Sequence, residues 1–134
     1  MQIILDANIY ISFAIRSTAL KPLRDAYSAE KFTPLVSTYL LAEVENVLNR
    51  PKFDKYIKQD EKELALKRII TLAKIIQIKQ PFPEFSDHKD RYLLAMLRDS
   101  EAEILVTGDK KLLAVETYND KTIISPQNFM NKYI

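Results

Sequence analysis

Apolar residues along the chain form two kinds of pattern, short continuous runs and longer segments with helical spacing. Four short runs predict strands buried on both faces, at 2–5, 33–37, 104–106 and 122–124. Segments with an apolar residue at every third or fourth position predict amphipathic helices, at 8–15, 38–50, 61–76, 87–100, 110–115 and 126–133. Thr18 and Asp60 are expected to cap helices, a short helix is expected at 53–57, and the prolines within 80–85 predict a loop.

Strands therefore alternate with helices along most of the chain. Strands connected through helices favour a parallel sheet with helices on both faces, which is a three-layer α/β/α arrangement. The length of 134 residues suits one domain, so we expect a single α/β domain over 1–134. In such sheets the functional site lies at the carboxyl ends of the strands.

Composition removes several classes of function. The chain has one glycine, which is too few for a dinucleotide-binding fingerprint or a P-loop. It has no cysteine and one histidine, His88, which excludes thiolate zinc sites, iron–sulfur clusters and three-histidine zinc sites. Carboxylates, lysines, hydroxyls and tyrosines remain for catalysis.

Charge and hydropathy add little about partners. The net charge of +2 does not by itself indicate nucleic acid. The segment 50–79 has nine Lys or Arg against four Asp or Glu, which fits either a face for phosphates or a solvated helix surface. No apolar stretch is long enough to span a membrane, and the first residues do not resemble a signal peptide, so we expect a cytoplasmic protein.

Acidic residues gather where the predicted strands end. Asp6 follows the first strand and Asp109 follows the third, so both are expected at the same edge of the sheet. Asp87 and Asp90 lie three residues apart at a predicted helix start and share one face. Glu43 lies between apolar positions of its helix and is expected to point near the core. Four segments can thus deliver carboxylates to one cleft.

A cluster of carboxylates is costly unless a cation compensates the repulsion. Oxygen ligands without histidine or cysteine suit Mg²⁺ or Mn²⁺, and the sequence leaves open whether one or two ions bind. Each acid also has a structural alternative. Asp6, Asp87 and Asp109 suit helix N-caps, Asp90 suits the positive end of a helix dipole, and Glu43 suits an ion pair with a nearby Lys or Arg.

Four segments together resemble the PIN-domain family of nucleases. They read LDANIYIS, STYLLAEVENVLNRPKF, SDHKDRYLLAM and ILVTGDKKLL, in the order and spacing of that family and across essentially the whole chain. A fifth segment, IISPQNFM, is similar to the closing segment of VapC-like toxins of toxin–antitoxin pairs. The resemblance implies metal-dependent cleavage of single-stranded or structured RNA by an α/β/α domain, with an antitoxin as a natural protein partner.

The resemblance also assigns roles to particular positions. The four acids of the family fall on Asp6, Glu43, Asp90 and Asp109, which are the expected catalytic and metal-binding residues. Three further residues match supporting polar positions: Asn8, Asp87 and Thr107. Two departures stand out. A lysine replaces a second acid of the turn after the third strand, and His88 stands where proline is common.

Residues for substrate and partner contacts are less distinctive. Four basic residues border the acids and can contact phosphates: Lys89, Arg91, Lys110 and Lys111. Four aromatic residues flank the acidic segments and suit either base stacking or the core: Tyr10, Phe13, Tyr39 and Tyr92. Three apolar residues suit either a homodimer interface or the core: Ile11, Ile15 and Leu20.

Two other functions stay open at this point. Phosphatases of the haloacid-dehalogenase type also place an aspartate after the first strand, followed by a second aspartate two residues later. Here the motif is Asp6-Ala7-Asn8, so the second acid is missing. The domain could also bind RNA or protein without cutting RNA.

Overall fold

The computed structural model describes residues 1–134, and its centre is one six-stranded sheet. The strands lie in the order β3-β2-β1-β4-β6-β5. Every neighbouring pair is parallel except β5 and β6. The strands are β1 (Gln2–Leu5), β2 (Thr33–Val36), β3 (Lys74–Ile75), β4 (Ile104–Val106), β5 (Thr117–Tyr118) and β6 (Lys121–Ile124).

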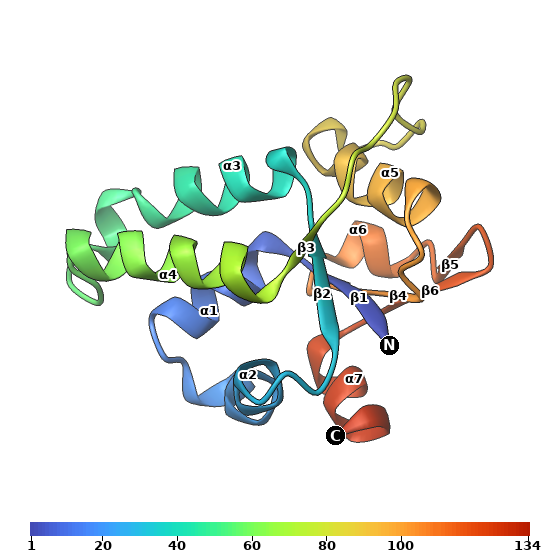
Figure 1. Ribbon diagram of the computed structural model, residues 1–134. Helices are drawn as coiled ribbons and strands as arrows, with labels where there is room; N and C mark the ends of the chain where they lie inside the picture. The colour runs from blue at the N-terminus through green and yellow to red at the C-terminus, as the bar shows by residue number, and fades with distance from the viewer.

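Helices cover both faces of the sheet. Figure 1 shows α1, α3 and α4 on one side and α5 and α6 on the other, with α7 beside α2. The helices are α1 (Ala7–Ala14), α2 (Lys21–Ser28), α3 (Thr38–Leu48), α4 (Gln59–Leu72), α5 (Arg91–Asp99), α6 (Lys110–Leu113) and α7 (Pro126–Tyr133). Short 3₁₀ turns occupy Thr18–Leu20, Pro51–Phe53 and His88–Asp90. The predicted three-layer α/β/α arrangement is confirmed.

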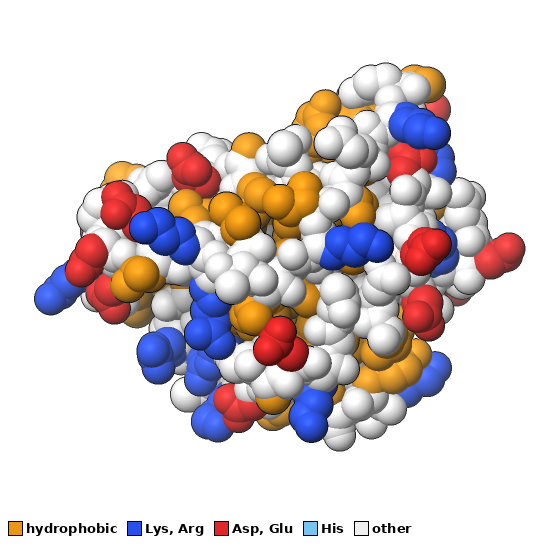
Figure 2. All heavy atoms as spheres, viewed as in Figure 1, with side chains coloured by type: hydrophobic (Ala, Val, Ile, Leu, Met, Phe, Trp, Pro, Cys, Tyr) orange, Lys and Arg blue, Asp and Glu red, His pale blue; other side chains and the backbone are white.

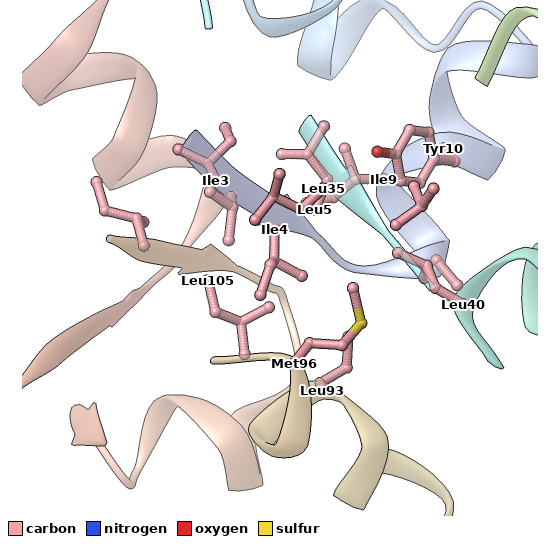
Figure 3. Close-up of a cluster of buried hydrophobic side chains, with 14 of the residues drawn as sticks. Ile3, Ile4, Leu5, Ile9, Tyr10, Leu35, Leu40, Leu93, Met96 and Leu105 are labelled. Atoms are coloured by element: carbon pink, nitrogen blue, oxygen red, sulfur yellow. The ribbon is translucent and has the colours of Figure 1, made fainter. Parts of the chain in front are cut away.

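The central strands form the core with the helices that follow them. Ile3, Ile4 and Leu5 of β1 are fully buried, as the position of β1 in the middle of the sheet requires. Figure 3 shows the β1 residues among Leu35 of β2, Leu105 of β4 and side chains of α1, α3 and α5. Each fully buried aliphatic side chain of this kind contributes about 1.5–3 kcal/mol.

The register of the strands brings their carboxyl ends level. Leu5 pairs with Val106, and Val106 pairs with Ile124. The next residues continue the pattern, since the Asp6 amide donates to the Val106 carbonyl at 3.0 Å and the Thr107 amide to the Ile124 carbonyl at 3.0 Å. Asp6 and Thr107 are therefore held side by side just beyond the sheet.

One predicted helix is too long, because its end forms an unpredicted edge strand. The helix expected at 61–76 ends at Leu72, and Ala73 has an extended backbone. β3 then pairs with β2, and the Ile76 amide donates to the Val36 carbonyl at 2.8 Å. The apolar periodicity continues through this segment, so only the free edge of β2 distinguishes strand from helix. Ile75 is consequently about half exposed, at 52 %, rather than on the predicted apolar face.

A second unpredicted strand, β5, forms an antiparallel hairpin with β6. Asn119 and Asp120 make its two-residue turn with φ values of 51° and 62°. Positive φ at both turn positions matches the turn that two-residue hairpins favour, and asparagine and aspartate tolerate it. The Asn-Asp pair is therefore a sequence signal for this hairpin.

Smaller differences concern the ends of helices. The segment after Thr18 begins as a 3₁₀ turn, and Leu20 occupies the N-cap of α2. Asp60 lies inside α4, whose N-cap is Lys58. The short helix expected at 53–57 lies earlier, at Pro51–Phe53. No helix in the protein is long and apolar enough to cross a membrane.

Candidate active site

Asp6 is the most buried acid at the carboxyl edge of the sheet, with 8 % of its surface exposed. It occupies the N-cap of α1, but its side chain makes no capping hydrogen bond. Its Oδ2 instead accepts a hydrogen bond from the Thr107 hydroxyl at 2.5 Å. The fold thus orients this carboxylate across the β1–β4 boundary, although Asp6 also holds the N-cap position that the capping alternative gave it.

Thr107 connects two of the acidic segments. Its hydroxyl, which is fully buried, also accepts a hydrogen bond from the Asp109 amide at 3.1 Å. Asp109 Oδ1 in turn accepts from the amides of Lys111 at 2.8 Å and Leu112 at 3.1 Å, so it caps α6. The capping alternative therefore holds for Asp109. These bonds use one carboxylate oxygen and fix the direction of the other.

Asp87 and Asp90 approach Asp109 from the 3₁₀ turn before α5. One carboxylate oxygen from each of the three residues lies within 4.8 Å of the other two. We call Asp87, Asp90 and Asp109 the acidic triad. The side chains of Asp87 and Asp90 make no helix-capping bond. None of the three salt bridges in the protein involves the acidic triad, Asp6 or Glu43.

Among the acids of the site, the pKa of Asp90 is raised most. Partial burial, followed by repulsion from Asp6, Asp87 and Asp109, raises the pKa of Asp90 from 3.8 to about 6. The pKa of Asp6 is also raised, first by burial, although the Thr107 hydrogen bond opposes the shift. Both shifts show that the folded protein holds these negative charges at a cost that a cation would offset.

Tyr92, one of the four aromatic residues that flank the acidic segments, lies in the first turn of α5 and belongs to the core rather than to an open stacking surface. It is buried, with 6 % of its surface exposed, and burial raises its pKa. Charges on Asp6, Glu43 and Asp90 raise that pKa further.

Glu43 is half-buried on α3, as expected, and has no ionic partner, so the ion-pair alternative fails. It lies outside the acidic triad, and so does Asp6. The structure thus brings Asp87, Asp90 and Asp109 closest together, and Thr107 links Asp6 to Asp109.

A model of the PIN domain matches residues 2–111 of this chain, which is most of its length and includes all of these acids. The chain belongs to the PIN-domain family. The closing segment at 123–130 lies outside the matched residues. A search of curated proteins gives no match.

This PIN domain also resembles a solved structure. A chain in the crystal structure of VapBC2 from Rickettsia felis, bound to a DNA fragment from their promoter, aligns with a TM-score of 0.61 and 14 % sequence identity. The alignment covers 93 % of this chain and 98 % of the Rickettsia chain. At this identity the likeness shows a shared fold.

The polar and basic residues around the acids are mostly exposed. Asn8 is exposed in the first turn of α1. Lys89, Lys110 and Lys111 are exposed, as phosphate contacts require. Arg91 is half-buried, and its Nε donates to the His88 carbonyl at 3.3 Å, so its orientation is partly fixed by its own turn.

The donor set fits a hard divalent cation. The acidic triad supplies carboxylate oxygens, and none of them forms a salt bridge with a basic side chain. Carboxylate oxygens are the protein ligands that Mg²⁺ and Mn²⁺ prefer. In this PIN domain, Asp87, Asp90 and Asp109 would hold such an ion, with Asp6 available beside them.

A large cavity lies elsewhere in the PIN domain, between α1, α2 and α4. Its volume is about 790 Å³, and no member of the acidic triad lines it. Its lining includes four basic residues, Arg16, Arg24, Lys67 and Arg68. Figure 2 shows Lys and Arg side chains gathered on this part of the surface. This cavity is therefore separate from the acidic triad.

Proposed function

We propose that this PIN domain is a metal-dependent endoribonuclease and the toxin of a toxin–antitoxin pair. The acidic triad carries the proposal, because three carboxylates within 4.8 Å of one another and outside any salt bridge suit a divalent cation. Mg²⁺ or Mn²⁺ would lower the pKa of a bound water and neutralise charge that develops on the phosphate.

The protein's own residues would prepare the site for this chemistry. Asp109 is oriented by two amides of α6, and Asp6 by the hydroxyl of Thr107. Such fixed carboxylates need little reorganisation when the substrate binds. Lys89, Lys110 and Lys111 are exposed beside them and would contact neighbouring phosphates.

The proposed reaction is hydrolysis by water, with no covalent enzyme intermediate. No cysteine or buried histidine is present that would act as a nucleophile. Cleavage would leave 5′-phosphate and 3′-hydroxyl ends. Cyclic 2′,3′-phosphate ends would contradict the proposal, because they require attack by the ribose hydroxyl of the substrate.

The test is cleavage of a mixed set of labelled RNAs by the purified protein in Mg²⁺, in Mn²⁺ and in EDTA. Asp6→Asn and Asp90→Asn should each lose at least about a hundredfold in rate, as is common when a catalytic electrostatic group is removed. Glu63→Gln is the control, since Glu63 is exposed on α4. Equal cutting by the wild type and both site variants would refute the assignment.

The alternatives give different outcomes. A phosphatase of the haloacid-dehalogenase type is disfavoured by membership of the PIN-domain family, and hydrolysis of a phosphate monoester without RNA cleavage would revive it. A non-catalytic binding domain would bind RNA or protein and cut nothing in any metal.

The proposal of an antitoxin partner draws on the likeness to VapBC2 from Rickettsia felis, which was solved bound to a DNA fragment from their promoter, and on the similarity of the closing segment to VapC-like toxins. Co-expression with the product of a small neighbouring gene should suppress the RNA cleavage. A homodimer stays a prediction. Ile11 is 4 % exposed and belongs to the core, which leaves Ile15 and Leu20 as the half-buried residues available to such an interface.

A further inference from the structure

An exposed aromatic side chain, Tyr39, lies next to the acidic site. Tyr39 is in the first turn of α3 and is 45 % exposed. Glu43 follows it by four residues, so both occupy the same face of the helix. The ring therefore lies beside Glu43 but is not part of the hydrophobic core.

Two other aromatic rings hold Tyr39 in place. Its ring lies nearly parallel to that of Tyr92, with centroids 6.5 Å apart and an interplanar angle of 20°. Phe82 meets it edge-on, with centroids 5.2 Å apart at 75°. The three rings come from α3, α5 and the loop between β3 and α5. Tyr39 is thus supported from two directions while nearly half of it faces solvent.

The loop that carries Phe82 is itself anchored. Arg98 donates to the carbonyls of Pro81 at 2.7 Å and Lys79 at 2.5 Å, and its guanidinium also pairs with Asp99. Asp99 Oδ2 accepts from the Lys79 amide at 2.7 Å. The support for Tyr39 is therefore built into the fold, and a ligand that stacks on the ring loses little conformational freedom from the protein.

Tyr92 connects this aromatic surface to the acids. Its ring packs with that of Tyr39, and it follows Asp90 of the acidic triad by two residues, in the first turn of α5. A phosphodiester held at the acids would therefore place an adjacent nucleobase near the exposed part of Tyr39. Aromatic side chains bind unpaired bases by stacking, because every base has a π-face. Bases inside a duplex are already stacked and are not available in this way.

We propose that Tyr39 is a base-stacking subsite beside the acidic triad and holds one unpaired nucleobase of the substrate. The inference rests on the proposed function for the identity of the substrate as RNA. It adds which part of the substrate is bound outside the acids.

The test measures RNA binding rather than cleavage. Affinity for a labelled single-stranded RNA is determined by fluorescence anisotropy in an Asp90→Asn background. Tyr39→Ala should weaken binding about tenfold to hundredfold, and Tyr39→Phe should stay within about threefold, because the stacking ring is retained. Tyr39→Leu retains apolar bulk without a π-face and should behave like Tyr39→Ala.

A matched control separates stacking from a general loss of aromatic surface. Tyr56 is 58 % exposed and contacts Lys55 away from the acids, so Tyr56→Ala should not change RNA affinity. Removal of single bases along the RNA should reveal one abasic position that weakens binding, and this effect should vanish in Tyr39→Ala. A duplex of the same sequence should bind Tyr39→Ala and its parent equally.

Several outcomes would overturn the subsite. They are equal effects of Tyr39→Ala and Tyr56→Ala, full affinity in Tyr39→Leu, and an abasic effect that persists without Tyr39. RNA binding that depends on Tyr39 in a protein that never cuts would overturn the proposed function and leave the subsite. No RNA binding by the parent protein would overturn both.

Discussion

Replacing Asp90 with asparagine should make the metal-free protein more stable while removing its activity. Asp90 is partly buried and faces repulsion from Asp6, Asp87 and Asp109, which raises its pKa from 3.8 to about 6. Asparagine has nearly the same shape and no charge. The substitution therefore removes the repulsion without leaving a cavity.

The size of the effect follows from the pKa. A shift from 3.8 to about 6 corresponds to about 3 kcal/mol in favour of the protonated form in the folded state. Solvent at this half-buried group screens part of the effect, which leaves about 1–2 kcal/mol. Because the pKa of Asp90 is raised in the folded state, its protonation contributes this stability to the wild type in full below about pH 4. The wild type loses the contribution as the pH rises through about 6.

The difference in free energy of unfolding between Asp90→Asn and the wild type can be measured by urea unfolding monitored with circular dichroism. In EDTA at pH 8, Asp90→Asn should be about 1–2 kcal/mol more stable than the wild type, and the difference should shrink at pH 5. Mg²⁺ should stabilise the wild type more than the variant at pH 8. Glu63→Gln, an exposed control, should change none of these values. Lower stability of Asp90→Asn in EDTA at pH 8 would refute the electrostatic reasoning.

Three further substitutions test the contacts around the site and the core. Thr107→Val removes the hydroxyl that links Asp6 to Asp109, and it should lower the free energy of unfolding by about 2–4 kcal/mol. Loss of this hydrogen bond should also raise the pKa of Asp6 and shift the pH profile of activity upward. Wild-type stability would show that this bond contributes nothing. Phe129→Ala removes a fully buried ring that meets Phe32 edge-on, with ring centroids 6.0 Å apart. The free energy of unfolding, measured in urea, should fall by about 3–5 kcal/mol. A fall of less than about 1 kcal/mol would mean that α7 does not complete the core. Arg98→Ala should leave the core intact but release the loop between β3 and α5, measured as faster proteolysis of that loop, and unchanged proteolysis would contradict the anchoring role.

The main strands and helices could be predicted because their apolar patterns are local. The runs at 3–5 and 104–106 have no polar residue, and β1 and β4 form there with the predicted bounds of 2–5 and 104–106. β3 could not be predicted in this way, because its residues continue the helical periodicity of α4. Its formation depends on the exposed edge of β2, which is a property of the assembled sheet.

The acids of the site could be located from the sequence, but their roles could not be ranked. The carboxyl-end rule places Asp6 and Asp109 at one edge, and the register of β1 and β4 shows why. The membership of Asp87 in the acidic triad depends on the 3₁₀ turn before α5, which the helical pattern does not reveal. The burial of Tyr92 in the core depends on the packing of α5 against the sheet.

The most direct test of the central claim is the position of Mn²⁺ in crystals of the wild-type protein, measured from anomalous scattering. The account predicts at least one peak coordinated by Asp90 and Asp109, with Asp87 or Asp6 completing the protein ligands, and no such peak in Asp90→Asn crystals. Full occupancy of Mn²⁺ at this place in Asp90→Asn, or Mn²⁺ bound only at other sites in the wild type, would contradict the assignment of the acidic triad as the metal centre.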